Sequence, residues 1–254
     1  MTTDLHGRVA LVTGAAGGMG AAHARRLAAA GATVAVNDIR DSAQLRALAA
    51  EIGGATAVGD VSDPDECVRL TAEVAHAAGG LDILVANHAY MTMAPLLEHD
   101  PDDWWKVVDT NLGGTFFLVQ AALPHLRTRG GGRIVVITSE WGVTGWPAAT
   151  AYAAAKSGLI ALVKTLGREL AAEHIIVNAV APGVTDTPQL QVDADAAGVG
   201  LDQMHREYAA AIPLGRIGIG DEIAAAVEML CDFEMEAVVG QVISCNGGST
   251  RTRV

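Results

Sequence analysis

The sequence predicts an α/β protein in which one parallel, doubly wound sheet of about seven strands carries helices on both faces. Predicted strands and helices alternate along the chain, a pattern typical of parallel sheets. The strand segments are predominantly apolar, as expected for strands that are buried on both faces. With 254 residues, half of them hydrophobic, the chain can form one large core. We therefore expect a single domain over residues 1–254.

The first elements follow each other closely. Arg8–Thr13 is predicted as a short buried strand, and it runs directly into the glycine-rich stretch Gly14–Gly20. Ala21–Ala30 has helical composition, Thr33–Val36 reads as the next strand, and Ser42–Ile52 as the next helix. A strand, a glycine-rich turn and a helix in this order are the context in which a glycine motif indicates a nucleotide site.

The alternation continues through the middle of the chain. Ala55–Val58 is a short strand, and the helix from about Pro64 to Ala78 places its proline in the first turn, where a missing N–H is tolerated. Leu81–Ala86 is the fourth strand. A long helical pattern with Asn111 in its middle then covers Pro101–Arg127.

The last third completes the sheet. Between Val184 and Pro213 the pattern is irregular, and we expect a mobile helical lid over the site at about residues 184–213. The regular elements expected here are the strand Arg133–Ile137, a helix running from Tyr152 to about Ala172, the strand Ile175–Ala181, the helix Asp221–Cys231 and the strand Val242–Ser244.

Composition excludes several classes of partner. The formal net charge of −12 argues against nucleic acid and against an anionic membrane surface, because their phosphates would be repelled. No segment has the apolar run of a signal peptide or a membrane span. Cys67, Cys231 and Cys245 form no metal or disulfide pattern, and no histidines have metal-ligand spacing, so we expect a cytoplasmic protein without a metal.

The glycine-rich turn predicts a dinucleotide site. Glycines let the backbone approach a pyrophosphate, and the following helix offers free N–H groups at its start. Asp38 ends the second strand, where a carboxylate accepts hydrogen bonds from ribose hydroxyls and repels a 2′-phosphate, which selects NAD over NADP. Asp38 could instead cap the helix that starts near Ser42, and Arg40 could meet a 2′-phosphate.

Tyr152 and Lys156 lie four residues apart in a run of alanines, a spacing that places both on one face of a helix. An ammonium beside a phenol lowers the proton affinity of the phenol, so that the tyrosine can act as an acid or base near neutral pH. Considered by itself, the pair is also compatible with a surface tyrosine and a solvated lysine. In combination with the other motifs, the pair is better explained by a catalytic role.

Over nearly its whole length the chain resembles the short-chain dehydrogenase/reductase family. The motifs that carry the resemblance are spread along the sequence, and they are Thr13–Gly14–x–x–x–Gly18–x–Gly20, Asp60, Asn111, Ser139, Tyr152, Lys156 and Pro182–Thr187. The chain departs from the family pattern at two places, with Ala86–Asn87–His88–Ala89 after the fourth strand and Asn246–Gly247–Gly248 after the last.

The resemblance implies a Rossmann-type fold and a role for each matched residue. Tyr152 would be the general acid or base, Lys156 would lower its pKa and hold the nicotinamide ribose, Ser139 would bind the substrate oxygen, and Asn111 would position a water for a proton relay. NAD would be held by residues that follow the strands, namely Gly14, Gly18, Met19, Gly20, Asp38, Asp60, Val61, Asn87, Tyr152, Lys156, Pro182, Gly183, Val184, Thr185 and Thr187. For Ser139 and Asn111, a strand-end cap and a buried amide are the alternatives.

The substrate side is predicted from family position. Ser139, Trp141, Tyr90, Trp146 and Tyr152 would contact a moderately hydrophobic secondary alcohol or its ketone. Further candidates for the pocket wall are His88, Met91, Val143, Val184, Leu190, Leu201 and Met204. Glu140, next to the serine, is an unusual residue at this place and is also compatible with a side chain in solvent, and His88 is either a second relay group or a strand-end cap.

These observations predict an NAD(H)-dependent alcohol dehydrogenase or carbonyl reductase. One alternative is a reductase of 3-oxoacyl groups on an acyl-carrier protein, although Asp38 and the net charge speak against its NADPH and its acidic carrier. Another is a dinucleotide sensor without catalysis. The resemblance also suggests a homotetramer, with the alanine-rich Ala148–Ala155 and the Phe116–Phe117 pair at subunit contacts.

Overall fold

A computed structural model describes residues 3–250 of the chain. Its centre is a seven-stranded, entirely parallel sheet with the order β3-β2-β1-β4-β5-β6-β9, so the predicted fold class is confirmed. Its strands are β1 (Val9–Val12), β2 (Thr33–Asp38), β3 (Ala55–Val58), β4 (Ile83–Ala86), β5 (Gly132–Ile137), β6 (Ile175–Pro182) and β9 (Val242–Cys245).

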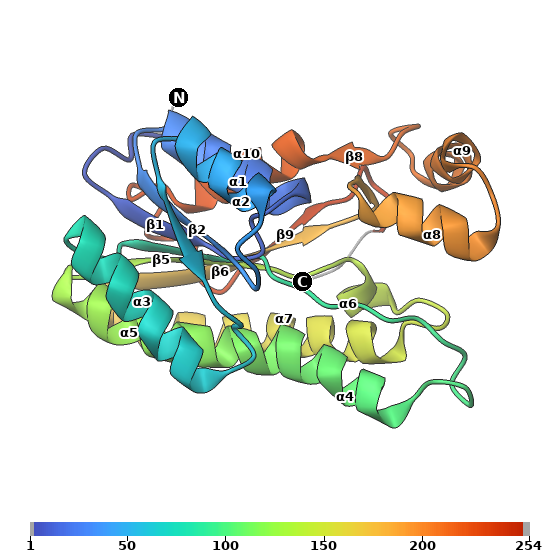
Figure 1. Cartoon of the computed structure of the whole chain (residues 1–254), viewed down its shortest axis with the longest axis horizontal. Coiled ribbons are helices and arrows are strands. Elements are labelled where there is room, and N and C mark those ends of the chain that lie inside the picture. The colour runs from blue at the N-terminus through green and yellow to red at the C-terminus, as the bar shows by residue number, and fades with distance from the viewer. Residues whose placement is uncertain (1–2, 251–254) are drawn as a thin grey trace.

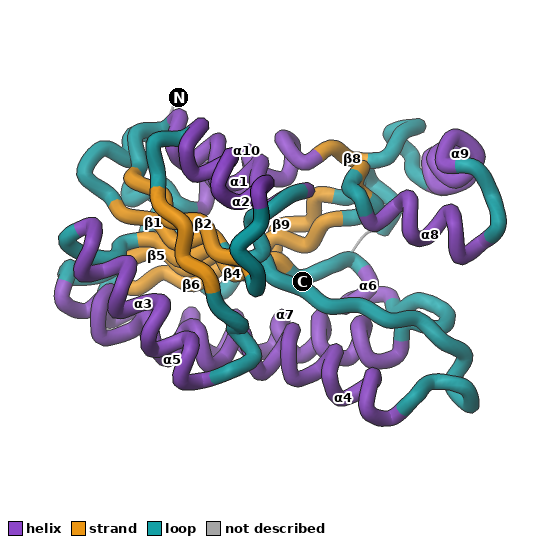
Figure 2. Tube along the Cα trace, viewed as in Figure 1, coloured by secondary structure: helices purple, strands orange, loops and turns teal. Residues whose placement is uncertain are grey.

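Helices cover both faces of this sheet (Figure 1). One layer contains α1 (Gly18–Ala29), α2 (Ala43–Glu51) and α10 (Gly220–Leu230). The opposite layer contains α3 (Pro64–Ala78), α4 (Pro101–Val108), α5 (Gly114–Thr128) and α7 (Thr150–Leu170). The tube view shows the sheet between the two layers (Figure 2).

Alternate side chains of each strand enter two separate cores. In β1, Val9 and Leu11 pack toward α3, α5 and α7, whereas Ala10 and Val12 pack toward α1, α2 and α10. Neighbouring side chains of a strand point to opposite faces, so the predominantly apolar strands supply both cores. The sheet is thereby anchored on both faces, and the candidate site residues lie at or beyond the carboxyl ends of its strands.

The segment after β6 folds into elements of its own. Here β7 (Thr185–Asp186) pairs with β8 (Gly218–Ile219), and between them lie α8 (Gln189–Ala197) and α9 (Leu201–Ala211). These two helices share a small third core that includes Leu190, Ala194 and Met204. Periodicity predicted helical content here but neither the helix boundaries nor the two-residue strands.

The long helix predicted over Pro101–Arg127 is interrupted. A π-helical turn at Asp109–Gly113 separates α4 from α5, and it places Asn111 inside the protein with no exposed surface. Two other short elements were not predicted, the helix α6 (Trp141–Thr144) and a 3₁₀ turn at Ala171–Glu173. Within residues 3–250, no helix is long and apolar enough to cross a membrane.

Candidate active site

Two cavities open beside the carboxyl ends of the strands. The larger has a volume of about 1270 Å³, and the smaller one of about 240 Å³. They adjoin each other, because both are lined by Met19, Ala89, Thr187 and Gln189. In open parallel sheets ligands bind at this edge, where the strand order reverses, here between β1 and β4.

The glycine turn forms one wall of the larger cavity. Gly14 has a φ of +61°, and a Cβ atom there would lie 2.8 Å from the Cα of His88. A Cβ on Gly20 would lie 2.2 Å from the carbonyl oxygen of Gly14. Only glycine fits this turn, and α1 begins without a side-chain cap, so its first N–H groups are available to an anion.

Asp38 lies next to the glycine turn and lines the larger cavity. Its carboxylate accepts hydrogen bonds from the backbone N–H of Ala16 at 3.1 Å and of Ile39 at 2.9 Å. The alternative that Asp38 caps the next helix is wrong, because the Ser42 side chain caps α2 by accepting from the Leu45 N–H. Arg40 lines the same cavity, so it remains a competitor for a 2′-phosphate.

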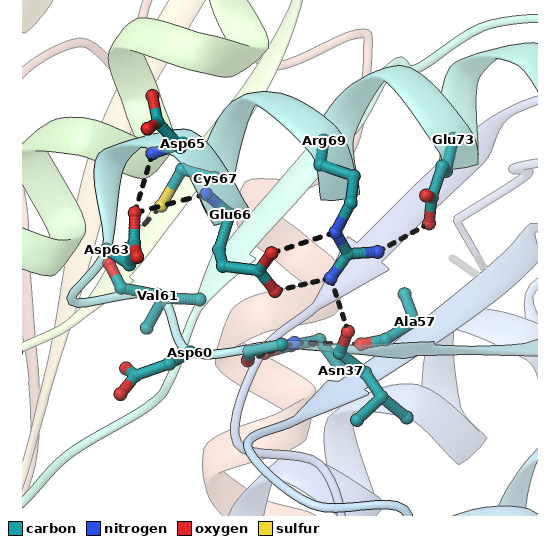
Figure 3. Close-up of polar contacts among 12 residues, drawn as sticks. Asn37, Ala57, Asp60, Val61, Asp63, Asp65, Glu66, Cys67, Arg69 and Glu73 are labelled. Atoms are coloured by element: carbon teal, nitrogen blue, oxygen red, sulfur yellow. Dashed lines mark hydrogen bonds and ion pairs between the residues drawn. The ribbon is translucent and has the colours of Figure 1, made fainter.

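Asp60 and Val61 form the wall beyond β3. Asp60 Oδ1 accepts from both the N–H and the hydroxyl of Ser62, which orients the carboxylate. Behind this loop, Arg69 is bracketed by Glu66 and Glu73 on α3 (Figure 3). Arg69 also donates to the Val58 carbonyl at 2.7 Å, and this bond ties α3 to the end of β3.

Asn87 joins β4 to the glycine turn. Its amide group donates to the carbonyl oxygens of Thr13 and Gly14, both at 3.0 Å. Its Oδ1 is buried and has no hydrogen-bond partner among the described residues. A buried acceptor of this kind calls for a donor. That donor is offered by the neighbouring His23 ring, on which Asn87 acts, so the fit to a dinucleotide rests on the glycine turn and on the acidic residues after β2 and β3.

His88 is the centre of a buried hydrogen-bonded chain. Thr115 donates its hydroxyl to the Asn111 carbonyl at 2.8 Å, so it must accept from Nε2 of His88, which lies 3.3 Å away. Nδ1 of His88 is then the acceptor for the Thr13 hydroxyl at 2.8 Å. Burial, with a smaller effect of Lys156, lowers the pKa of His88 to about 3.

Asn111 holds the segment that follows β4. Its Oδ1 accepts from the Tyr90 N–H, and its Nδ2 donates to the Tyr90 carbonyl, both at 2.8 Å. The side chain therefore clamps the backbone of Tyr90 through both of its polar atoms. Its backbone carbonyl, bonded to Thr115, is the group that the π-helical turn exposes to the interior.

Tyr152 and Ser139 line the smaller cavity together. Lys156 lies one turn further along α7, with its Nζ 5.5 Å from the centre of the Tyr152 ring. The ammonium is buried and donates to the Ile137 carbonyl at 2.7 Å. The sheet thus supplies Ser139, and α7 brings Tyr152 and Lys156 over the end of β5.

The protonation state differs from the sequence expectation. Burial raises the pKa of Tyr152 to about 12, and Ser139 acts in the opposite direction. Burial also lowers the pKa of Lys156 to about 8. In this structure desolvation is the largest effect on the phenol, and the Lys156 ammonium is directed to a backbone carbonyl rather than to the phenol.

The segment that follows β6 lies over the junction of the two cavities. Gly183, Val184 and Thr185 line the smaller cavity, and Thr187 lines both. Pro182 ends β6 and lines neither, since it is buried in the strand.

The residues predicted to contact the substrate do not all line the same cavity. Trp141 lines the smaller cavity with Tyr152, its ring at 81° to the tyrosine ring. Trp146 does not line it, because this ring stacks on the outer side of Trp141 and stays 44% exposed. Tyr90 lines the larger cavity instead, since Asn111 fixes its backbone and Lys106 lies over its ring.

Comparison with known proteins assigns the family. A family model described as enoyl-(acyl carrier protein) reductase matches residues 14–250. The chain belongs to the short-chain dehydrogenase/reductase family. It is 37% identical over 250 residues to 3-oxoacyl-(acyl-carrier-protein) reductase FabG of Thermotoga maritima, a match that covers 96% of this chain and 98% of the relative.

Two other relatives of this family have different substrates in their names. Cis-4-hydroxycyclohexanecarboxylate dehydrogenase of Sinomonas cyclohexanicum is 38% identical over 247 residues, with 96% of each chain covered. The 2-dehydro-3-deoxy-L-rhamnonate dehydrogenase (NAD(+)) of a Sphingomonas species is 36% identical over 248 residues, again with 96% of each chain covered. The chain is therefore an oxidoreductase of this family, which binds a nicotinamide dinucleotide, and its substrate is not fixed by similarity.

Sequence reasoning missed two features of this family member's site. Glu140 was noted beside Ser139 without a role, and the structure shows that it is 8% exposed and lines the smaller cavity. The chain from Thr13 through His88 to Thr115 was also missed, because its members lie far apart in the sequence. The only available signals were the departure from the family pattern at His88 and the charged residue beside Ser139. No cluster of three or more metal-ligating side chains occurs in the described part of the chain.

Proposed function

We propose that the protein is an NAD(H)-dependent oxidoreductase that interconverts a moderately hydrophobic secondary alcohol and its ketone. The observation that carries this proposal is the junction of the two cavities. Tyr152 and Ser139 line the small one, and Asp38 lines the large one, which has the glycine turn in its wall. A dinucleotide and a small substrate would therefore meet at the shared wall.

Each residue has a role in this reaction. The glycine turn, Asp38 and the Asp60–Val61 wall would hold the dinucleotide, which supplies or accepts a hydride when it is bound. Ser139 would hydrogen-bond the substrate oxygen, and Tyr152 would give or take its proton. The pKa of Lys156, lowered to about 8, lets this ammonium exchange a proton near neutral pH. The proton would pass on to solvent through a water positioned by Asn111.

Asp38 is the basis for choosing NAD over NADP. Its carboxylate is held at the turn by Ala16 and Ile39, and a fixed negative charge there repels a 2′-phosphate. The relative from Sphingomonas is named as an NAD(+)-dependent dehydrogenase, which supports this choice. Arg40 in the same cavity acts against it.

The proposal also covers the domain organisation, the cellular compartment and the assembly of the enzyme. Residues 1–254 would be one domain, with about 184–213 acting as a lid over the smaller cavity, to which it contributes Leu190 from α8. The free thiols of Cys67 and Cys231 are buried, as suits a reducing cytoplasm. The assembly would be a homotetramer, and nucleic acid and membranes would not be partners.

A second candidate is a reductase of 3-oxoacyl groups on an acyl-carrier protein. Two relatives carry that name, at 37% and 35% identity. The net charge of −12 opposes an acidic carrier, and Asp38 opposes NADPH. The two candidates therefore differ in cofactor as well as in substrate.

The test is hydride transfer, followed by nicotinamide absorbance, with NAD and NADP in parallel against secondary alcohols, ketones and a 3-oxoacyl thioester. We expect turnover with NAD and a loss of about 100-fold or more in Tyr152→Phe, because the proton donor is gone. Asp38→Asn should shift the ratio of kcat/KM toward NADP. Retained NAD binding in Tyr152→Phe is the control for folding.

Two other outcomes of this experiment would replace the proposal. Preference of the wild type for NADP and the thioester would replace the proposal with the second candidate. Binding of NAD without turnover of any compound would favour a sensor without catalysis.

A further inference from the structure

The smaller cavity contains a charged residue for which the proposed reaction has no role. Glu140 follows Ser139 after the end of β5, and the residue is 8% exposed. It lines the cavity together with Ser139, Trp141 and Tyr152. A buried carboxylate is costly unless donors surround it, so its partners show whether it has a further task.

Among the described residues, a hydrogen-bond donor reaches only one oxygen of Glu140. Oε2 accepts a hydrogen bond from the Ser249 hydroxyl, which follows β9. The backbone N–H of Glu140 donates to the Pro182 carbonyl at 2.9 Å, so its position is fixed at the ends of three adjacent strands. No donor among residues 3–250 reaches Oε1, which lies beside Gly183 on the cavity wall.

The charge of the cavity wall restricts what this free oxygen can bind. Besides Glu140 the wall contains Asp193, which accepts from the Gln189 amide, and none of the described lining residues is lysine, arginine or histidine. A carboxylate or phosphate on the substrate would therefore meet like charges in a space of about 240 Å³. The free oxygen instead calls for a hydrogen-bond donor.

Two kinds of donor are possible, a hydroxyl and an ammonium group. A cationic substrate group would be attracted by Glu140 and Asp193, but next to the reacting carbon it would meet the Lys156 ammonium, which lies 5.5 Å from the centre of the Tyr152 ring. The remaining wall includes Met91, Trp141, Val184 and Leu190, which suit uncharged carbon. These observations favour a neutral substrate with one additional hydroxyl group.

We propose that Glu140 is a specificity-determining residue whose Oε1 accepts a hydrogen bond from a second hydroxyl, adjacent to the reacting carbinol, of a small neutral diol or hydroxyketone. This inference rests on the proposed function, and it narrows the substrate class of the same site. The proposal distinguishes this protein from enzymes that act on 3-oxoacyl thioesters. In those substrates the thioester carbonyl near the reacting carbon has no hydrogen to donate to Oε1. The reaction itself is unchanged, with the proton still passing through Tyr152.

The test compares butan-2-ol, butane-2,3-diol, 3-hydroxybutanoate and 3-aminobutan-2-ol, which share one carbon skeleton. We expect the wild type to prefer the diol over butan-2-ol by about tenfold or more in kcat/KM, because a hydrogen bond to a charged acceptor is gained. Glu140→Leu should reduce this ratio to about one. Glu140→Gln should retain part of the diol preference and raise the use of 3-hydroxybutanoate, since the like charge is removed.

The matched control is Glu169→Gln, which removes the same charge from an exposed position on α7 and should leave the ratio unchanged. Ligand-detected NMR titration of the diol and of butan-2-ol, with NADH present, measures the same preference without turnover, because neither alcohol can be oxidised by the reduced cofactor. The inference can thus be judged even if the proposed reaction fails. An unchanged binding ratio in Glu140→Leu would overturn it, as would a wild-type preference for the amino alcohol or for 3-hydroxybutanoate.

Discussion

Two histidine side chains, His23 and His88, are buried beside the glycine turn. His23 has no exposed surface, and neither of its ring nitrogens has a hydrogen-bond partner among the described residues. Burial lowers the pKa of His23 to about 4, with Asn87 acting in the opposite direction. Both imidazoles are therefore neutral in the folded protein at pH values where an unfolded chain would protonate them.

This difference predicts acid instability. Because the pKa of each histidine is lower in the folded state, the unfolded state binds more protons below about pH 6.5, and the free energy of unfolding falls as the pH falls toward 4. Each histidine contributes up to about 1.4 kcal/mol per pH unit in that window. Urea unfolding of His23→Asn between pH 4.5 and 8 should show a flatter pH dependence than the wild type.

The matched control is His76→Gln, which removes an exposed histidine from the last turn of α3. Its pH dependence should follow the wild type. Equal slopes for His23→Asn and the wild type would show that His23 is not the proton-binding group responsible.

Local spacing predicted those site residues whose roles depend on nearby sequence. Tyr152 and Lys156 are brought onto one side of α7 by helical periodicity, and Asp38 is placed by the end of β2. Glu140 could not be predicted in this way, because its burial depends on Pro182 and Ser249, which only the sheet brings close. The lowered pKa of His88 likewise depends on a tertiary environment.

At the scale of single elements, the start of α3 is fixed by its cap. The Asp63 side chain accepts from the N–H groups of Asp65 and Glu66, and Pro64 occupies the first turn. Asp63→Ala should lower the free energy of unfolding by about 1 kcal/mol, since these donors lose their acceptor. Because the Asp60–Val61 wall immediately precedes this cap, the Kd for NAD should also rise. Urea unfolding and a cofactor titration measure the two effects.

Asp63→Asn is the conservative control, because the amide oxygen can still accept from both N–H groups. It should retain most of the stability and of the NAD affinity. If Asp63→Asn lost as much stability as Asp63→Ala, the negative charge rather than the hydrogen bonds would be the stabilising feature.

Sequence periodicity located the elements better than it described their interruptions. The strands of the sheet lie where the apolar runs placed them, because burial on both faces leaves a strong signal. The π-helical turn at Asp109–Gly113 left no such signal, since α4 and α5 continue the same helical pattern on each side. The turn is maintained by the distant clamp between Asn111 and Tyr90.

At the scale of the whole molecule, alternation of elements predicted a parallel sheet but not its strand order. The order places β1 and β4 side by side, although two strands separate them in the sequence. This adjacency brings Asn87 to the glycine turn and opens the larger cavity there. The dinucleotide site is thus a consequence of topology, and the glycines adapt it to close contact.

The surface adds an argument about assembly. Phe116 on α5 is 45% exposed, and it packs edge to face against Phe117 at a ring separation of 5.7 Å. The other proposed contact is wrong in part, because Ala149, Ala151 and Ala155 are buried within the chain itself. On this layer, Phe116 and the accessible Ala153 and Ala154 remain as apolar surface for a subunit contact.

We predict that the protein sediments as a tetramer, at four times the 26.1 kDa of one chain. Phe116→Asp should dissociate it, because a charge buried in an apolar contact is not compensated. The matched control is Val68→Asp, which places the same charge at an exposed apolar position on α3. Sedimentation velocity distinguishes the species. A wild type that is monomeric at micromolar concentration, or equal dissociation by both variants, would contradict a contact through α5.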